Sequence, residues 1–238
     1  MIIFKKLQGF VKYLNQNMPL EKSKNYDDYW DNREVTSDIS KLSANHRKRI
    51  LAEQLIPNGS SVLDIGCGTA GLNDAFIYAK KDIVYTGYDM FDKLDDIQSS
   101  KKIKLYNKDI LQEKYLGIYD YITILNVLEH VHHPEDFIEK IRPNFRKSLF
   151  VSVPNIGSLK NRVRLGIFGK FPITGVYFHA SEHIRFWTVK DFKHWSNVYG
   201  YDVKNYYGTG YWGWGVKFFP SLVSENILYQ LTRKDEQI

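Results

Sequence analysis

Short apolar runs recur along the chain and alternate with segments whose apolar residues repeat at helical spacing. Runs typical of strands span 61–65, 83–88, 103–106, 119–125, 149–153, 201–207 and 227–233. Helices are expected over 39–56, 71–80, 92–99, 134–145 and 188–200. Strands that alternate with helices in this way build a parallel sheet with helices on both faces. The pattern therefore predicts an α/β fold.

Two segments interrupt the alternation. Residues 154–187 are rich in glycine and proline, and a shorter insertion at 208–220 is rich in aromatic residues and glycine. A loop region as long as 154–187 usually has a function, so we expect it to form a lid over a site. Its basic side chains can bind a phosphate or carboxylate, although a solvated helix face explains them equally well. The side chains considered for such binding are Arg162, Arg164, Lys170 and Arg185.

The first residues follow a basic amphipathic pattern, in which lysines alternate with an apolar stripe. The stripe consists of Ile3, Leu7, Phe10, Val11 and Leu14. Such a helix can lie on a membrane surface, but the same face can dock on the domain or on a second subunit, which we expect here. We therefore divide the chain into an N-terminal helix at 1–25 and a main domain at 26–238.

The strand expected at 61–65 leads into the sequence G-C-G-T-A-G at 66–71. Glycines in this pattern permit a tight turn and a close approach of the backbone to a ligand. Asp64 lies two residues before the first glycine, where a carboxylate repels a pyrophosphate but attracts an ammonium group. This arrangement favours S-adenosylmethionine over NAD. Asp64 would hold the amino group, and Gly66, Cys67 and Gly68 would lie against the amino acid and the ribose.

Carboxylates also follow the next two predicted strands. Asp89 comes about 20 residues after the first glycine, where an acid can accept hydrogen bonds from both ribose hydroxyls. Asp109 can accept one from the exocyclic amine of adenine, and Met90 and Ile110 can flank the ring. Open α/β sheets bind ligands beyond the carboxyl ends of their strands. The alternative is that each aspartate only caps a helix or turn.

Composition narrows the class of protein. The 238 residues suffice for one α/β domain with insertions, and the single cysteine, Cys67, excludes an internal disulfide. We find no uncharged apolar run of the length that spans a bilayer and no secretory signal, so we expect a cytoplasmic enzyme. The net charge of +6 favours anionic partners, but solvated lysine faces produce it as often, and no nucleic-acid partner is expected.

Together, these motifs resemble those of class I S-adenosylmethionine-dependent methyltransferases over about residues 26–207. The sequence L-N-V-L-E-H-V at 125–131 resembles the segment after the fourth strand of small-molecule methyltransferases. The stretch 152–192, which includes H-I-R-F-W-T, is similar to the MetW-like group of methionine biosynthesis. The glycine loop lacks an acid after its second glycine, and the N-terminal helix and the W-G-W-G sequence at 212–215 are additional. These departures leave the substrate open.

The resemblance implies a Rossmann-like sheet of seven strands, mostly parallel with the last one antiparallel. The cofactor would lie over the first three strands, with Asn126 among its contacts, and the acceptor over strands four and five. Tyr29, Trp30 and Arg33 resemble an N-terminal segment that closes over the cofactor, and the fork of Arg33 suits a carboxylate. An ordinary surface arginine beside two core aromatic residues fits the same pattern.

Histidine is the side chain best suited to act as a base near neutral pH. His130 follows the fourth strand and would face the methyl group, so we expect it to act as the base or on the cofactor side. His183 in the lid is expected to contact the acceptor. A structural hydrogen bond to a loop carbonyl is the alternative for both. The remaining residues expected on the acceptor side are His132, Tyr177, His179, Arg185 and Trp187.

The same region is dense in potential metal ligands, because Glu129 is followed by three histidines within four residues. The side chains of the adjacent His132 and His133 diverge, however, and the chain contains no H-E-x-x-H spacing. We therefore expect no metal.

The leading interpretation is a methyltransferase that moves a methyl group from S-adenosylmethionine to a small polar or anionic acceptor, leaving S-adenosylhomocysteine. O-methylation of a sugar, a sugar nucleotide or a surface-glycan precursor fits best. The alternative is a MetW-like, cofactor-binding partner of a homoserine acyltransferase, and a homodimer is also considered. The sequence N-V-L-E at 126–129 disfavours nucleobase amino-methylation, which uses an N-P-P-Y-type loop, and Asp64 disfavours a dehydrogenase.

Overall fold

The computed structural model describes residues 2–18, 47–90, 103–173, 182–210 and 214–234. The strands are β1 Ser61–Ile65, β2 Val84–Asp89, β3 Lys104–Asn107, β4 Tyr119–Leu125, β5 Phe145–Pro154, β6 Tyr201–Thr209 and β7 Asn226–Arg233. The α-helices are α1 Ile2–Asn15, α3 Arg47–Leu55, α4 Gly71–Tyr78, α6 Pro134–Ile141, α7 Leu159–Phe168, α8 Val189–Val198, α9 Trp214–Phe218 and α10 Pro220–Val223. Short 3₁₀ helices are η3 Ile110–Gln112, η4 Leu128–His130 and η5 Arg142–Asn144.

The strands form one seven-stranded sheet in the order β3-β2-β1-β4-β5-β7-β6. β1 pairs in parallel with β2 and β4, whereas β7 runs antiparallel to both β5 and β6. The expected Rossmann-like sheet with an antiparallel last strand is therefore confirmed. Because the first five strands are parallel, their carboxyl ends meet at one edge of the sheet, which is where ligands bind in this architecture.

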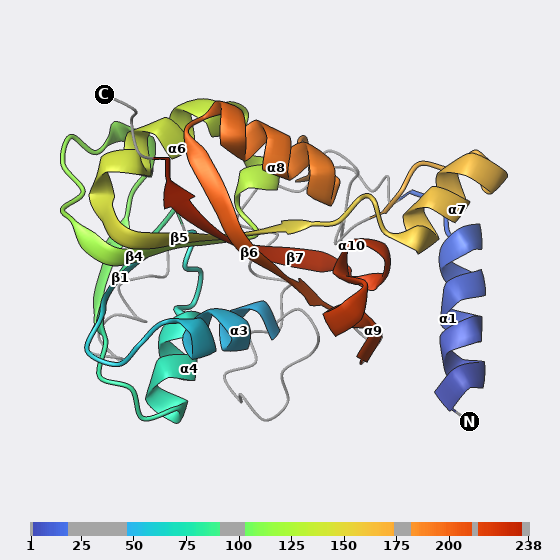
Figure 1. Cartoon of the computed structure of the whole chain (residues 1–238), viewed down its shortest axis with the longest axis horizontal. Helices are drawn as coiled ribbons and strands as arrows, with labels where there is room; N and C mark the ends of the chain where they lie inside the picture. Colours follow the sequence, from blue (N-terminus) through green and yellow to red (C-terminus); the bar gives the residue numbers. More distant parts are fainter. Residues whose placement is uncertain (1, 19–46, 91–102, 174–181, 211–213, 235–238) are drawn as a thin grey trace.

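Helices cover both faces of the sheet, with α3 and α4 on one side and α6 and α8 on the other (Figure 1). Val62 and Leu63, neighbours in β1, belong to two different buried clusters. Successive side chains of a strand point to opposite faces, so a continuous apolar run supplies both layers of the core. This burial on both sides explains why the parallel strands were readable as short apolar runs.

β5 begins at Phe145, four residues earlier than the apolar pattern indicated. Only β4 pairs with the strand over 145–148, because the pairing with β7 starts at Leu149. Because residues 145–148 have a neighbouring strand on one side only, this part of β5 can carry the exposed residues Arg146 and Lys147. These two charged residues interrupt the apolar run, so the sequence pattern did not indicate a strand there. The preceding helix α6 accordingly ends at Ile141, and the turn η5 replaces its expected last residues.

The helix expected at 39–56 is described as α3 from residue 47 onward, and the helix expected at 92–99 lies outside the described residues. The cap expected for α8 is present, because the Thr188 hydroxyl accepts a hydrogen bond from the Asp191 amide at 3.2 Å. Gly200 follows the helix with a left-handed φ of 79°, as a helix-ending glycine does.

The segment 154–187 is not a loop throughout, because it contains helix α7. Arg164 of α7 is only 1% exposed. Its guanidinium donates to the backbone carbonyls of Tyr13, Leu14 and Gln16 at the end of α1, and Lys170 donates to the carbonyl of Asn15. Carbonyls at a helix C-terminus lack partners within the helix and attract cations. The expectation that Arg164 binds a ligand anion is therefore wrong, since its donors are used to cap α1.

Candidate active site

The turn after β1 has the backbone shape that its glycines permit. Gly66 and Gly68 have φ values of 71° and 53°, and the Gly66 amide donates to the Tyr88 carbonyl of β2 at 2.7 Å. A Cβ on Gly66 would lie 2.2 Å from a methyl group of Val127. The glycine therefore allows the segment after β4 to pack directly against the turn.

Asp64 has different neighbours from those the sequence suggested. Its carboxylate is buried within the sheet, where it accepts hydrogen bonds of 2.6 Å from the hydroxyls of Tyr85 and Thr123. Burial raises the pKa of Asp64, and the two hydroxyls oppose that rise. Each carboxylate oxygen keeps a further lone pair and can still accept a hydrogen bond. Contact with the ammonium group of the cofactor stays a prediction. In the structure, Asp64 ties β1 to β2 and β4.

Asp89 lies where the sequence placed it, at the end of β2 and beside the glycine turn. Its carboxylate accepts a hydrogen bond from the Gly68 amide at 2.7 Å, and the side chain is 7% exposed. Asp109 comes after β3 and uses one oxygen to cap η3, accepting from the Leu111 amide at 2.9 Å. The structure thus brings both acids to the same edge, and Asp109 also has the capping role considered for it.

The other residues expected around the cofactor differ in accessibility. Met90 is 56% exposed, whereas Ile110 is 3% exposed and packs in the core. Contact of either side chain with an adenine ring stays a prediction. The Cys67 side chain is also buried and faces Gly87, so only its backbone belongs to the turn. Asn126 follows β4 with a φ of 60°, and its side-chain oxygen accepts a hydrogen bond from the Ser152 hydroxyl at 2.6 Å.

Sequence reasoning missed Arg49 of helix α3. A Cβ on Gly71, the first residue of α4, would lie 2.5 Å from the Arg49 guanidinium. The Arg49 charge also opposes the rise that burial causes in the pKa of Asp64, just before the glycine turn. No motif marks this arginine, because its position depends on how α3 packs beside α4. The sequence singled out Arg33 instead, which lies outside the described residues.

On the acceptor side, the turn η4 after β4 meets the segment that precedes α8. The Glu129 carbonyl accepts hydrogen bonds from the amides of Ile184 and Arg185, and His130 Nδ1 donates to the Glu182 carbonyl at 2.5 Å. The His130 and His183 rings therefore meet edge to face, with centroids 4.8 Å apart. Both candidate histidines are brought together at the carboxyl edge of the sheet, and His130 makes the loop-carbonyl bond that was the alternative.

The third residue of this cluster is Glu129, which the sequence indicated only as a potential metal ligand. Its side chain is fully buried, and neither carboxylate oxygen has a hydrogen-bond partner among the described residues. Burial raises the pKa of Glu129 to about 7, while the Lys48 charge and the nearby Asn126 amide oppose the rise. The geometry of Asn126 falls short of a hydrogen bond to these oxygens. A carboxylate with this pKa can take up a proton near neutral pH.

His183 is buried beside Glu129, and its Nδ1 has no hydrogen-bond partner among the described residues. Burial, together with the smaller effect of the neighbouring His130, lowers the pKa of His183 to about 3. The imidazole is therefore neutral at physiological pH. The cluster thus pairs a neutral imidazole with a carboxyl that titrates near neutrality, and the role of His130 as the base stays a prediction.

The remaining acceptor-side predictions have mixed outcomes. Exposed Arg185 donates to the His132 carbonyl, so these two residues do meet. Trp187, by contrast, is 8% exposed and packs against Phe192 and Trp195 in the core. Trp187 therefore supports α8, and the contact with an acceptor that the sequence suggested stays a prediction. The residues Tyr29, Trp30, Tyr177 and His179 lie outside the described residues.

Within the described ranges, Glu129, His130 and His183 form a group whose potential ligand atoms lie within 4.8 Å of one another. Two atoms bound to one ion at about 2.1 Å are at most roughly 4.2 Å apart. The group therefore comes close to the spacing of a metal site, and the expected absence of a metal stays a prediction.

A family model described as a methyltransferase domain matches residues 29–205. The chain belongs to this methyltransferase domain family. The expected class I S-adenosylmethionine-dependent methyltransferase is thereby confirmed at the level of family and fold, and the MetW-like subgroup stays a prediction.

Relatives of this methyltransferase include the ubiquinone biosynthesis O-methyltransferase of Coxiella burnetii, which is 33% identical over 100 residues. The match covers 39% of the chain and 42% of the relative, so the chain spans about two fifths of the length of the curated relatives it matches.

Solved structures show the same fold at low identity. The 1,6-didemethyltoxoflavin-N1-methyltransferase of Burkholderia thailandensis, which contains S-adenosylhomocysteine, is 11% identical with a TM-score of 0.59 and covers 91% of this chain and 94% of its own. The magnesium protoporphyrin IX methyltransferase of Synechocystis, with the same bound molecule, is 18% identical with a TM-score of 0.56 and covers 87% and 94%. Among the described residues of our methyltransferase, we find no helix of the length and apolarity needed to span a bilayer.

Proposed function

We propose that this enzyme transfers a methyl group from S-adenosylmethionine to a hydroxyl oxygen of a small polar acceptor, with Glu129 as the general base. The buried Glu129 carboxylate beside neutral His183 is the observation that carries the proposal. Glu129 lies after β4, two residues beyond Val127, which packs against the glycine turn. We also propose a cytoplasmic location.

The donor side of the site fits the cofactor through the glycine turn and the acids at the strand ends. Gly66 and Gly68 leave the backbone open to a ligand, and Asp89 is positioned for ribose hydroxyls. Exposed Met90 offers an apolar surface to adenine, and Arg49 offers its guanidinium to a carboxylate. When bound, S-adenosylmethionine supplies a methyl group on a positively charged sulfur.

On the acceptor side, Glu129 accepts the proton that an acceptor hydroxyl loses as its oxygen is methylated. His183 is neutral and so adds no positive charge near a sulfonium group. Its imidazole can hydrogen-bond the acceptor and orient it, which is the contact expected for it. Burial of both groups excludes water, and this strengthens their interaction with the acceptor.

The acceptor class proposed is a hydroxylated small molecule, such as a sugar or a surface-glycan precursor. The relatives named as O-methyltransferases support transfer to oxygen. An anionic acceptor has less support than the sequence suggested, because Arg164 is buried against α1. Exposed Arg185, next to His132, is the basic group that stays available on this side.

The substitution Glu129→Gln tests the base. We expect the variant to lose about 100-fold or more in methyl transfer, as removal of a general base does, while its affinity for S-adenosylmethionine is unchanged. Methyl-labelled cofactor with a metabolite extract, followed by identification of the labelled product, provides the assay, and calorimetry provides the affinity. The control is Glu139→Gln on the exposed side of α6. Full activity in the Glu129 variant would refute its role.

The same assay separates an enzyme from the alternative, a MetW-like binding partner. An enzyme gives a labelled product and S-adenosylhomocysteine in equal amounts. Cofactor binding with no labelled product, together with stimulation of an acyltransferase, would replace the proposed function by that alternative. Addition of a chelator also tests the cluster, because base catalysis by Glu129 is expected to continue when divalent ions are removed.

A further inference from the structure

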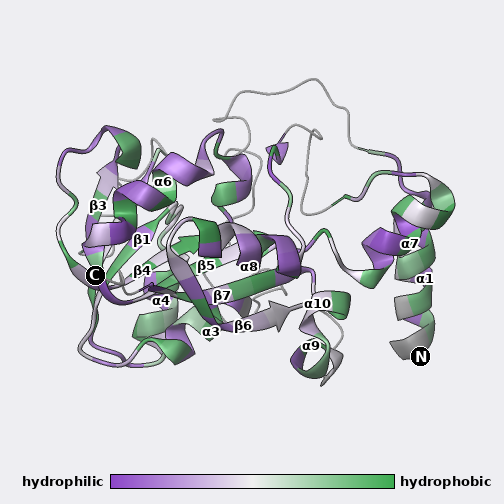
Figure 2. Ribbon diagram, turned by 45° about the horizontal axis from the view of Figure 1, so that its top comes forward, coloured by the Kyte–Doolittle hydropathy of each residue, from purple (hydrophilic) through white to green (hydrophobic). Residues whose placement is uncertain are grey.

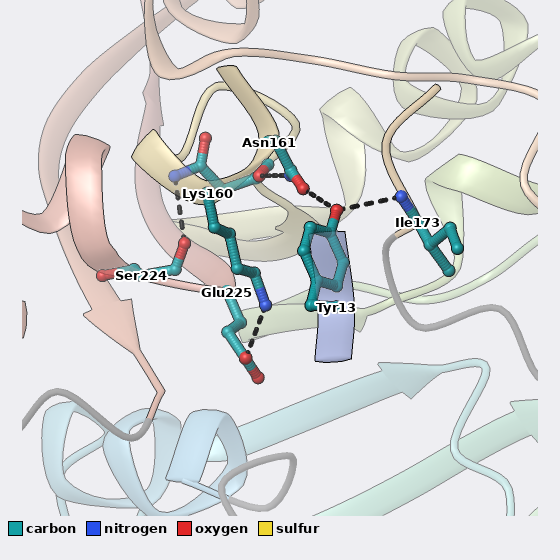
Figure 3. A network of polar contacts seen from close by, with 7 residues as sticks. Tyr13, Lys160, Asn161, Ile173, Ser224 and Glu225 are labelled. Carbon is teal, nitrogen blue, oxygen red and sulfur yellow. Dashed lines mark hydrogen bonds and ion pairs between the residues drawn. The ribbon is translucent and has the colours of Figure 1, made fainter. Parts of the chain in front are cut away.

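Helices α1 and α7 lie side by side at the end of the molecule away from β1 and β4 (Figure 1), and we call this pair the α1–α7 arm. The Tyr13 hydroxyl donates to Asn161 and accepts from the Ile173 amide at 3.1 Å (Figure 3). Lys160 forms an ion pair with Glu225 at 2.8 Å and lies over the Tyr13 ring. These contacts, with the Arg164 cap, hold only the C-terminal end of α1.

The rest of α1 presents an apolar stripe to solvent. Phe4, Leu7 and Val11 are 68%, 56% and 48% exposed, and Leu14 at the fastened end is buried. These residues recur three and four positions apart, so they share one side of the helix. Figure 2 shows the arm standing at the edge of the molecule with hydrophobic residues along α1.

Helix α7 adds apolar side chains to the same arm. Leu165, Ile167 and Phe168 near its C-terminus are 53%, 75% and 46% exposed. Single exposed apolar residues are ordinary, but a contiguous group of them marks an interaction surface. A helix of 14 residues is also marginal in water without a packed face. We therefore expect a partner to cover the exposed apolar stripe of α1.

The charge of the arm identifies the kind of partner. The ranges 2–18 and 156–173 contain seven lysines and arginines and no aspartate or glutamate. Lys5 and Lys12 are exposed and seven residues apart, so they follow one flank of the stripe. An exposed apolar stripe with lysines beside it is the pattern of a helix that lies in a membrane interface. Lys160 pairs with Glu225 and Arg164 is buried, but a second copy would still bring the exposed Lys5 and Lys12 against like charges.

We infer that the α1–α7 arm docks this enzyme on the surface of a bilayer that contains anionic lipids. Phe4, Leu7 and Val11 enter the boundary between head groups and acyl chains, and Lys5 and Lys12 meet the anionic head groups. The arm lies on the surface and does not span the bilayer. This inference concerns where the enzyme acts and is independent of the acceptor.

Vesicle flotation with the full chain tests the inference. We expect binding to vesicles of equal parts phosphatidylcholine and phosphatidylglycerol to be about tenfold or more tighter than binding to phosphatidylcholine alone, and to weaken as salt is raised. Phe4→Ser with Leu7→Ser and, separately, Lys5→Gln with Lys12→Gln are expected to lose this binding. The matched control is Lys104→Gln with Lys190→Gln, two exposed lysines elsewhere on the molecule.

Because the substituted residues are exposed, the variants should fold, and methyl transfer in solution should persist. Loss of vesicle binding with intact methyl transfer separates the arm from the catalytic site. Equal binding to neutral and anionic vesicles, or unchanged binding of the Phe4 and Leu7 variant, would overturn the inference. A dimer in solution that dissociates in that variant would also overturn it, in favour of a contact between two copies.

Discussion

At the scale of single residues, burial determines the chemistry of the acceptor side. Glu129 and His183 are neighbours, yet burial moves their pKa values in opposite directions, to about 7 and about 3. Burial disfavours the charged form of each group. The result is a carboxyl that titrates near neutrality beside an imidazole that stays neutral. His130, which the sequence favoured as the base, is exposed and is held by the Glu182 carbonyl.

The raised pKa of Glu129 predicts a pH dependence of stability. Because the folded pKa of about 7 exceeds the ordinary value of 4.5, the native state binds more protons than the unfolded state between these values. The Glu129 contribution is therefore fully present below about pH 4.5 and is lost as the pH rises through about 7, by on the order of 3 kcal/mol. Denaturant unfolding of Glu129→Gln and the unsubstituted protein across this range measures the difference. A constant difference would contradict the shift.

At the scale of elements, the Arg164 cap makes α7 the support of α1. The Arg164 guanidinium donates hydrogen bonds to three carbonyls at the C-terminal end of α1. The remainder of α1 lies away from the sheet, at the edge of the molecule (Figure 1). Local stability follows local packing, so the cap residue controls the whole helix. An arginine that looks like a ligand-binding group in the sequence thus acts between two helices.

Arg164→Met is expected to release α1 without disturbing the catalytic site. The substitution removes the donor to three carbonyls, of which that of Leu14 is buried, at a cost of roughly 1–3 kcal/mol for a buried group left without a partner. We expect hydrogen exchange of residues 2–15 to accelerate by about tenfold or more, while cofactor affinity is unchanged. Arg162→Gln, two positions away and exposed, is the matched control. Unchanged exchange in the Arg164 variant would show that other contacts suffice to hold α1.

The elements were largely readable from the sequence, whereas the long-range contacts of the acceptor side were not. β4 was predicted with its observed bounds because it is a continuous apolar run, and Asp89 was found because it follows a strand near a glycine turn. The Glu129 carbonyl, by contrast, accepts hydrogen bonds from the amides of Ile184 and Arg185, more than 50 residues further on. Periodicity reports which face of an element is buried, but it does not report which distant loop covers a side chain.

At the scale of the whole molecule, the sheet brings the donor and acceptor sides to one edge. The acids after β2 and β3 lie on one side of β1, and the cluster after β4 lies on the other, as the strand order requires. A bound cofactor would contact several elements at once. Such binding stabilises the entire fold, because the ligand binds the native state alone.

S-adenosylmethionine at about 100 times its Kd is therefore expected to stabilise the protein by roughly 2.7 kcal/mol, which raises Tm by several degrees. Asp89→Asn should abolish this shift, because the acid beside the Gly68 amide loses its charge. Scanning calorimetry with and without the cofactor measures both. Asp82→Asn, at an exposed position, is the control. An equal shift in the Asp89 variant would remove this residue from the donor site.

The contact between Gly66 and Val127 has a consequence for how this enzyme can change. Val127 presses on the glycine turn from one side, and Glu129 follows it by only two residues. A residue larger than valine at 127, or any side chain at 66, would therefore displace the turn after β1 and the turn η4 together. A change in acceptor preference is then expected from substitutions in the segment before α8, which contacts Glu129 and His130 from the other side.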